Sequence, residues 1–307
     1  MMAKRKISLQ SLSTSRFGIA FALAIARYTP RWLGYWIARR LAGLVSSRRS
    51  SMMIRALRAN QWVIRGCKPD ARELDQIVKR VVLKHTRCLY DFYRNIDRPD
   101  EILRLVSFSP EFQQLFDRLK AGTESTLFVA PHISNFDLAG RALALRGLNF
   151  QVLSYPQPTG GYQWQNQMRS DIGIEVTPMS ISALQKARAR LRNGGVVLTG
   201  LDRPLEDTRY YPRFFDRPSP LPVAYVQMAL QIGVPIIVVA CITLPDQTYQ
   251  LICQPTIYPQ QNSMREVELV SNAEMVLQQA EELIRRDPDQ WAMFYPVWPD
   301  SLDDTPQ

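Results

Sequence analysis

Strand-like and helix-like runs alternate from about residue 121 to the end of this 307-residue chain, and this order constrains the fold more than any other feature. Apolar and β-branched runs predict strands at 126–130, 150–154, 175–177, 196–199, 236–243 and 249–257. Helical spacing of apolar residues predicts helices at 135–146, 162–172, 182–192, 223–232 and 267–286. The alternation predicts an α/β fold with a mostly parallel central sheet flanked by helices, and the adjacent last strands allow an antiparallel edge.

The first 120 residues lack this alternation. They predict an amphipathic helix at 31–45 and further helices at 52–65, 71–95, 100–106 and 109–121. We therefore expect a basic, membrane-facing helical region over residues 1–120 and an α/β part over residues 121–307, with one continuous core shared between them.

The positive charge of the chain is concentrated at its N-terminus. Fourteen of the 38 basic residues lie in residues 1–69, which hold no acidic residue, whereas the remaining 24 are outnumbered by 28 acidic residues. Such a segment suits either nucleic acid or an anionic membrane surface. Apolar and aromatic residues, among them Trp32, Tyr35 and Trp36, separate the arginines, which favours the membrane and argues against nucleic acid.

The length of the apolar runs limits the kind of membrane contact. Residues 17–26 form an uncharged run of ten, about half of what a spanning helix needs, and Pro30 interrupts any continuation. We therefore expect peripheral or monotopic association. The alternative is that these helices pack on the chain's own core and expose their arginines to solvent.

The segment around His132 carries the most specific chemistry. A strand ends at Ala130, Pro131 follows, and a helix is expected to start near Ser134. His132 then lies at the carboxyl end of a strand, where open α/β sheets bind ligands. Asp137 falls in the first helical turn, where its carboxylate can approach the imidazole, fix its tautomer and leave the other nitrogen basic.

Structural interpretations of the same residues stay open. Ser134 and Asp137 also match a capping box, with Ser134 as N-cap and Asp137 bonded only to backbone donors. His85 lies in a charged helical run without an evident partner, so we interpret it as structural or surface-exposed. The four cysteines form no CxxC pair and neither histidine has a second ligand at metal spacing, so no metal site is predicted.

His132 and Asp137, four residues apart after Pro131, resemble the HX4D motif of the glycerolipid acyltransferase superfamily, in particular its branch of bacterial lipid A late acyltransferases and phosphatidylinositol mannoside acyltransferases. The lipid A enzymes usually carry glutamate where this chain has Asp137, which favours the mannoside-acylating or a related glycolipid branch. Further segments agree with that branch in order, over nearly the whole chain: the basic N-terminal helices, RANQWVIRG at 58–66, NQMR at 166–169, GLDR at 200–203, FFDRP at 214–218, GVP at 233–235 and QWAMFYPVW at 290–298.

The resemblance implies acyl transfer from acyl-CoA or acyl carrier protein to a hydroxyl of a glycolipid or lysophospholipid, without a cofactor, at the cytoplasmic face of a bacterial membrane. His132 would act as general base and Asp137 would support its imidazolium form. Asn166 and Arg169 would contribute to substrate binding, with Arg169 on an acceptor phosphate or the oxyanion. Asp202 and Arg203, which follow another strand near the same sheet edge, would shape the acceptor pocket, or Arg203 would form a structural ion pair.

Other functions can be compared with acyl transfer on the basis of the motifs present. The chain has no GxSxG, P-loop or GxGxxG pattern, so the sequence gives no support to the corresponding hydrolase, NTPase and dinucleotide sites. The rivals are a non-catalytic basic protein that binds membrane or nucleic acid, and a hydrolase of acyl thioesters. The basic helix at 182–192 suits either solvent or an acidic donor, and the aromatic and basic loop around Phe214 suits either headgroup contact or packing.

Overall fold

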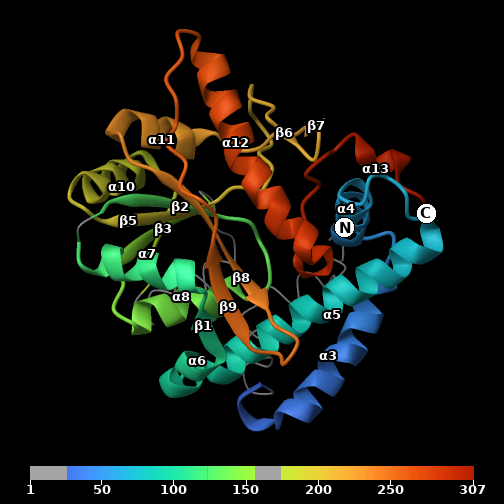
Figure 1. The fold of residues 1–307 in the computed structure, drawn as a ribbon. Coiled ribbons are helices and arrows are strands. Elements are labelled where there is room, and N and C mark those ends of the chain that lie inside the picture. The colour runs from blue at the N-terminus through green and yellow to red at the C-terminus, as the bar shows by residue number, and fades with distance from the viewer. Residues whose placement is uncertain (1–25, 123, 156–173) are drawn as a thin grey trace, which may run out of the picture.

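A seven-stranded sheet forms the centre of the computed structural model, which describes residues 26–122, 124–155 and 174–307 (Figure 1). The strand order is β1-β9-β8-β2-β5-β3-β4, and every neighbouring pair is parallel except β8 with β9. This confirms the mostly parallel α/β fold. The strands are β1 (Val106–Phe108), β2 (Thr126–Ala130), β3 (Phe150–Ser154), β4 (Glu175–Pro178), β5 (Val196–Gly200), β8 (Ile236–Thr243) and β9 (Tyr249–Cys253).

Six of these strands lie where the sequence predicts them, and β1 does not. Residues 100–106 were expected to be helical, but Val106 pairs with Tyr249 and starts a three-residue strand at the sheet edge. The predicted strand 249–257 ends at Cys253, and only a single bridge from Ile257 to Ile236 extends beyond it. In both places long-range pairing, rather than local periodicity, sets where the strand lies.

Helices cover both faces of the sheet. One face carries α5 (Ala71–Asn95), α6 (Pro99–Leu105), α7 (Pro110–Lys120) and α8 (Phe136–Leu145). The other carries α10 (Ile181–Arg192), α11 (Ala224–Ile232) and α12 (Arg265–Arg286). These agree with the predicted helices, and Gly233 ends α11 in the left-handed conformation as expected. The predicted helix 162–172 lies outside the described residues.

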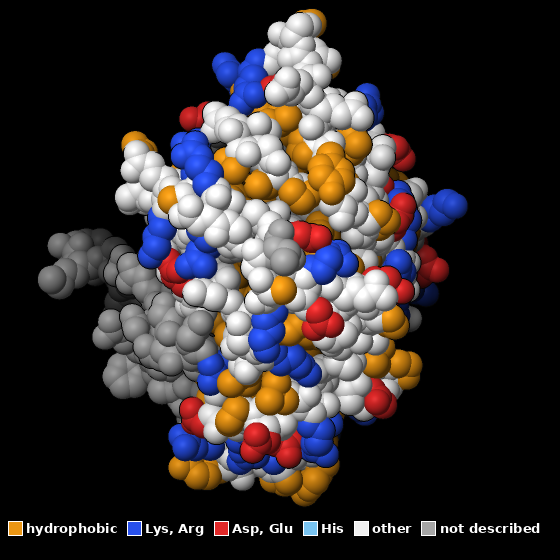
Figure 2. All heavy atoms as spheres, turned by 60° about the vertical axis from the view of Figure 1, so that its left-hand side comes forward, with side chains coloured by type: hydrophobic (Ala, Val, Ile, Leu, Met, Phe, Trp, Pro, Cys, Tyr) orange, Lys and Arg blue, Asp and Glu red, His pale blue; other side chains and the backbone are white. Residues whose placement is uncertain are grey.

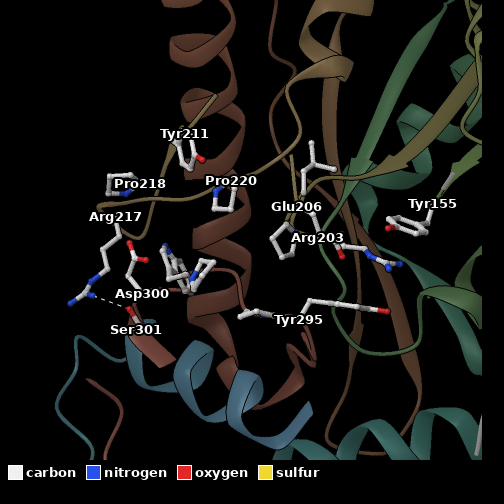
Figure 3. A pocket seen from close by; sticks show the side chains of 15 residues that line it. Tyr155, Arg203, Glu206, Tyr211, Arg217, Pro218, Pro220, Tyr295, Asp300 and Ser301 are labelled. Carbon is white, nitrogen blue, oxygen red and sulfur yellow. Dashed lines mark hydrogen bonds between the residues drawn. The ribbon is translucent and has the colours of Figure 1, made fainter. Parts of the chain in front are cut away.

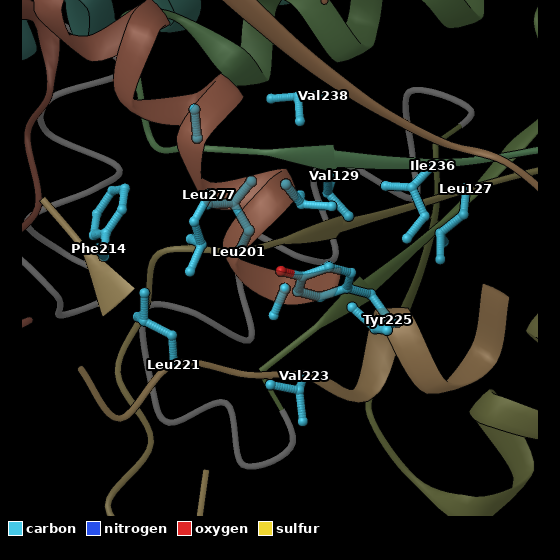
Figure 4. Packing of buried hydrophobic residues seen from close by; sticks show 14 of the residues in the cluster. Leu127, Val129, Leu201, Phe214, Leu221, Val223, Tyr225, Ile236, Val238 and Leu277 are labelled. Atoms are coloured by element: carbon cyan, nitrogen blue, oxygen red, sulfur yellow. The ribbon is translucent and has the colours of Figure 1, made fainter. Parts of the chain in front are cut away.

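Each face of the sheet has its own apolar core. Along β2, Leu127 and Val129 point to the α10–α12 side, and Phe128 points to the other side, as the two-residue period of a strand requires. Figure 4 shows the first of these cores, with Tyr225 of α11 packed among strand residues. The second core includes side chains from both sides of residue 120, such as Phe112 and Phe150.

Two further helices lie beside α5 at one edge of the molecule (Figure 1). Helix α3 (Arg31–Ser46) approaches α5 closely because its contact residues are small, namely Gly34, Ala38 and Ala42. A Cβ at Gly34 would overlap the ring of Tyr90, so a larger residue there would require that ring to move. Helix α4 (Met52–Val63) follows, and its contacts with the C-terminal part of the chain position the site described below.

The loops after β5 and after α12 were predicted least well. Residues around Phe214 form a short hairpin, β6 (Arg213–Phe214) and β7 (Arg217–Pro218), and the C-terminal segment forms η1 (Pro288–Gln290) and α13 (Ser301–Asp304). Phe214 and Phe215 are buried against Trp298, so packing explains this aromatic pair. In α10, Lys186 and Arg190 both pair with Glu175, which neutralises part of that basic helix.

The surface of the α/β part mixes both charge signs. Figure 2 shows blue and red side chains interspersed over the face that carries α10 and α11, with hydrophobic side chains gathered in its upper half. This agrees with the sequence, in which the positive excess belongs to residues 1–69. Residues 17–25 of the apolar run lie outside the described part of the chain, which begins at Ala26. Within the described ranges, no helix has the length and apolar character needed to cross a bilayer.

Candidate active site

His132 and Asp202 lie side by side at the carboxyl ends of two adjacent parallel strands. β2 ends at Ala130 and β5 at Gly200, and the strand register pairs these two residues. His132 and Asp202 each lie two residues beyond that pair, so the register brings them together although they are 70 residues apart in sequence. The sequence predicted this edge of the sheet for both residues, and the structure places them in direct contact.

The carboxylate of Asp202 is fully buried and accepts three contacts. Its Oδ1 lies 2.6 Å from Nδ1 of His132, and its Oδ2 accepts a hydrogen bond of 2.8 Å from the backbone N–H of His132. The indole N–H of Trp291 donates to the same Oδ2 at 2.7 Å. A buried charge requires such partners, because an unpaired carboxylate in the protein interior is strongly unfavourable.

These contacts keep Asp202 ionised. Burial alone would raise the pKa of this carboxyl, but the charge of His132 and the hydrogen bonds from His132 and Trp291 outweigh it and lower the pKa below the ordinary 3.8. An ionised Asp202 accepts the Nδ1–H of the imidazole, and we assign the tautomer from this contact. The Nε2 of His132 is then the basic nitrogen.

Trp291 reaches Asp202 because its segment runs antiparallel beside the His132 loop. Ile133 and Trp291 form an isolated antiparallel bridge, and the N–H of Ala292 donates to the carbonyl of His132 at 3.3 Å. The side-chain amide of Gln290 bonds to both the N–H and the carbonyl of Thr243, at 2.7 and 3.0 Å. The end of β8 therefore fixes the segment that supplies the third contact of Asp202.

Two buried amides of α4 hold the same segment from the other side. Gln61 donates to the carbonyls of Trp291 and Pro288, at 2.9 and 3.1 Å. Asn60 donates to the carbonyls of Met293 and Tyr295 and accepts from the N–H of Val297, at 2.9, 2.8 and 3.0 Å. The sequence singled out 58–66 and 290–298 as separate motifs, and the structure shows that they form one hydrogen-bonded unit.

Ion pairs join α5 and the turn after α4 to η1 and the residue before it. Asp289 pairs with Arg65 and Arg80, each at 2.6 Å, and Lys84 pairs with Asp287 at 2.6 Å. Arg65 and Asp289 are largely buried, so their pair is less screened than a fully exposed one. The basic N-terminal part of the chain therefore supplies internal ion-pair partners as well as exposed arginines.

The start of α8 differs from the sequence expectation. Asn135, rather than Ser134, is the N-cap and accepts from the N–H of Leu138 at 3.3 Å. Ser134 has a positive φ of 52°, and its hydroxyl lies 2.6 Å from that of Thr243. The turn after Pro131 thus extends one residue further than the capping pattern predicted, because Ser134 is bonded to the neighbouring strand.

A cavity of about 730 Å³ opens beside His132, which we call the active-site cavity. Most of its wall is apolar and comes from both faces of the sheet, including Phe92 and Cys241 on one side and Tyr225 and Met228 on the other. Its size falls within the about 300–1,000 Å³ typical of ligand sites. The wall suits an aliphatic chain, with the polar groups gathered at the sheet edge.

Asp137 and His85 also line the active-site cavity. Asp137 is half-buried in the first turn of α8, and the carboxylate that contacts Nδ1 of His132 is that of Asp202. His85 of α5 packs edge-on against Phe294 at 5.0 Å, so it is part of the cavity wall rather than the surface. Desolvation lowers the pKa of His85 to about 4, although the negative charge of Asp137 opposes this shift.

Arg203 follows Asp202 and is held between two tyrosines. Its guanidinium lies 3.7 Å from the ring centre of Tyr155 and 4.1 Å from that of Tyr295. Among the described residues it forms no ion pair, so the structural salt bridge considered from sequence is not observed there. Asn166 and Arg169 lie outside the described residues. Within the part of the chain that is described, no three His, Cys, Asp or Glu side chains form a group able to hold a metal ion.

Comparison with known proteins identifies relatives of the whole chain and of part of it. The family model described as "Bacterial lipid A biosynthesis acyltransferase" matches residues 2–299. The phosphatidylinositol mannoside acyltransferases of two Mycobacterium tuberculosis strains, H37Rv and CDC 1551, are 31% identical over 127 residues. That match covers 40% of this chain and 40% of each relative.

Proposed function

The chain belongs to the bacterial lipid A biosynthesis acyltransferase family, and from this premise we propose that it transfers a fatty acyl chain from a thioester donor to a hydroxyl of a glycolipid or lysophospholipid. The donor is acyl-CoA or acyl carrier protein, and no cofactor takes part. One observation carries the proposal: a histidine oriented by a buried carboxylate lines a large, mostly apolar cavity.

The reaction follows from the position of His132. Its Nε2 removes the proton from the acceptor hydroxyl, and the resulting oxygen attacks the thioester carbonyl. The tetrahedral intermediate then breaks the C–S bond, and the leaving thiolate takes the proton from the imidazolium. The products are an ester and a free thiol. Asp202 stabilises the imidazolium while it exists, because it stays ionised and contacts Nδ1.

The remaining predicted residues have supporting roles in this proposal. Asp137, on the wall of the same cavity, adds a second negative charge that favours the imidazolium. Arg203 binds the acceptor near the dyad, and its stacked guanidinium supports that role. Asn166 and Arg169 take part in substrate binding, Arg169 as partner of an acceptor phosphate or of the oxyanion, as the family resemblance implies.

The exposed face of α3 supports association with a membrane. Trp32, Trp36 and Leu44 are 72%, 52% and 65% exposed, next to the exposed Arg39 and Arg40. The opposite side of the helix packs on α5. Aromatic and apolar side chains with arginines between them suit the interface of an anionic bilayer. We place the protein at the cytoplasmic face of a bacterial membrane, as a peripheral or monotopic enzyme.

The membrane contact is testable separately from catalysis. Replacing both Trp32 and Trp36 with serine should reduce sedimentation with anionic phospholipid vesicles by tenfold or more, because each tryptophan loses about 1.5–3 kcal/mol of apolar burial. Gln76→Ala on the exposed side of α5 is the matched control. If the double variant sediments with vesicles as well as the control does, α3 is not the membrane contact.

Acyl transfer itself is tested with labelled donors. The full chain and its His132→Ala variant are incubated with radiolabelled palmitoyl-CoA or palmitoyl-acyl carrier protein and native membrane lipids, and the products are resolved. We expect a labelled lipid that the variant does not form. Donor consumption without a lipid product would indicate thioester hydrolysis. Equal transfer by both proteins would overturn the role of His132. No transfer by either would leave only the non-catalytic membrane-binding function.

A further inference from the structure

A second cavity, of about 630 Å³, lies next to the active-site cavity. The two share Tyr155, Arg203, Leu205 and Tyr295 in their walls. Figure 3 shows that the second cavity is formed by the loop after β5, the β6–β7 hairpin and the C-terminal segment. None of the side chains that are unique to this cavity takes part in the acyl-transfer steps derived above.

The lining of the second cavity is aromatic and polar rather than aliphatic. Its aromatic side chains are Tyr155, Tyr211, Tyr295 and Trp298, and five prolines stiffen the surrounding loops. Glu206 and Asp300 supply two exposed carboxylates that form no hydrogen bond or ion pair with other described residues. Arg203 and Arg217 supply two guanidinium groups, so the lining carries no net charge.

The charged groups of the second cavity differ in how many contacts they already make with other side chains. Arg217 donates to the hydroxyl of Ser301 at 3.2 Å and to the sulfur of Cys67 at 3.1 Å. Arg203 is stacked between Tyr155 and Tyr295, which leaves the edge of its guanidinium as the donor surface. Both carboxylates can only accept hydrogen bonds when ionised. The cavity therefore offers acceptors and flat aromatic faces to a ligand rich in hydroxyl donors.

The buried indole N–H of Trp298 also indicates a ligand that forms hydrogen bonds. Trp298 is only 3% exposed, lines the cavity and stacks on Phe214 with ring centres 5.6 Å apart. Its indole N–H has no acceptor among the described residues. Buried polar groups normally have a partner, so this donor is available to a ligand oxygen.

These features select one class of ligand. A polyphosphate such as that of coenzyme A needs a strongly cationic wall, and two carboxylates beside two arginines do not supply one. An aliphatic chain cannot form hydrogen bonds with the four charged groups, and covering them with it would be unfavourable. A sugar ring presents hydroxyl donors to carboxylates, hydroxyl acceptors to guanidinium and indole N–H groups, and C–H faces to aromatic rings.

We infer that the second cavity binds the saccharide of the acceptor lipid, with Glu206 and Asp300 accepting from its hydroxyls and Arg203 at the wall shared with the active-site cavity. This inference rests on the proposed function, since it assigns the polar part of the acceptor to one cavity and the reacting groups to the other. A sugar hydroxyl directed past Arg203 enters the cavity that His132 lines.

The test uses methyl α-mannoside as the probe, since the similar mycobacterial enzymes are named for a mannoside. Saturation-transfer NMR on the full chain is compared between the wild type and the Glu206→Gln/Asp300→Asn double variant. Both residues are exposed, so the variant should fold, and Glu282→Gln/Asp304→Asn is an exposed control of the same charge change. Loss of hydrogen bonds to charged groups should weaken mannoside binding about tenfold in the double variant only.

Catalytic readouts separate this inference from the proposed function. In the double variant, the KM for the glycolipid acceptor should rise about tenfold, whereas the KM for the thioester donor should change much less. His132→Ala should retain mannoside binding and lose transfer. Equal mannoside binding by wild type and double variant, no binding by the wild type, or its displacement by free coenzyme A would each overturn the saccharide assignment. Loss of the His132 effect alone would overturn the acyltransferase mechanism and leave the saccharide site standing.

Discussion

The two cavities differ in what builds them. The active-site cavity is lined mainly by strand and helix residues that also form the apolar cores, such as Leu127, Met228 and Cys241. The second cavity is lined by loops and by the C-terminal segment, with charged and aromatic side chains. The active-site cavity is therefore tied to the stability of the fold, whereas the second cavity lies on segments that can vary without disturbing the core.

The largest effects are expected in the active-site cavity, from substitutions of the two carboxylates Asp202 and Asp137. Asp202→Asn should lower kcat by about 10²–10⁴-fold, because the amide cannot stabilise the imidazolium and mispairs with Nδ1. Asp137→Asn should cost less, since Asp202 is the carboxylate that contacts Nδ1 of His132. Steady-state kinetics with a thioester donor measures both. A larger loss for Asp137→Asn than for Asp202→Asn would return the orienting role to Asp137.

Removing the Trp291 donor should give a smaller effect on the same cavity. Trp291→Phe keeps an aromatic ring but deletes the hydrogen bond to Asp202, so about 1.5–3 kcal/mol of unfolding free energy should be lost, together with part of kcat. Chemical denaturation and kinetics measure the two losses. Mannoside binding in the second cavity should not change. A variant with unaltered stability would show that the indole N–H contributes nothing to holding the carboxylate.

The amides of α4 distinguish the two cavities. Gln61→Ala frees the carbonyls of Trp291 and Pro288 and should lower stability by about 1–3 kcal/mol and reduce kcat, with mannoside binding intact. Asn60→Ala should impair both functions, because Asn60 also holds Tyr295 and Val297 beside the second cavity. Gln76→Ala is the control. Identical behaviour of the two amide variants would mean that the cavities are positioned as one unit.

The smallest expected effect is a change in the pH dependence of stability. Because the pKa of His85 is about 4 in the folded chain and 6.5 when unperturbed, the unfolded chain binds more protons between these values. His85 therefore makes the protein less stable as the pH falls from about 6.5 towards 4. His85→Gln should flatten this part of the melting-temperature profile. A wild-type profile that is already flat there would contradict the desolvated position of His85 in the cavity wall.

The sequence was a good guide where local pattern decides structure. Six strands and the longer helices among the described residues follow from apolar periodicity, and His132 was correctly placed after a strand. The sequence was a poor guide to which side chains contact each other. Asp137 is five residues from His132 and Asp202 is 70 away, so proximity in sequence drew attention to Asp137 and did not indicate the Nδ1 contact with Asp202. Ser134 was chosen as N-cap for the same local reason, although a neighbouring strand binds it instead.

Residues that act across the fold gave no local signal. Asn60 and Gln61 are buried amides in a helix, and only the carbonyls of a segment more than 220 residues away explain them. Trp291 is one apolar residue among several in its motif until the bridge to Ile133 directs its N–H to Asp202. The shared motifs at 58–66 and 290–298 were the one available hint, and they did not indicate that the two segments touch.

By itself, the sequence determined the order of strands and helices, the concentration of positive charge in residues 1–69 and the position of His132 at a strand end, because each depends on neighbours along the chain. Only the tertiary structure decided which carboxylate orients His132, what holds that carboxylate and that a second, polar cavity adjoins the first. Strand register and loop packing set those contacts, and both depend on residues that are distant in sequence.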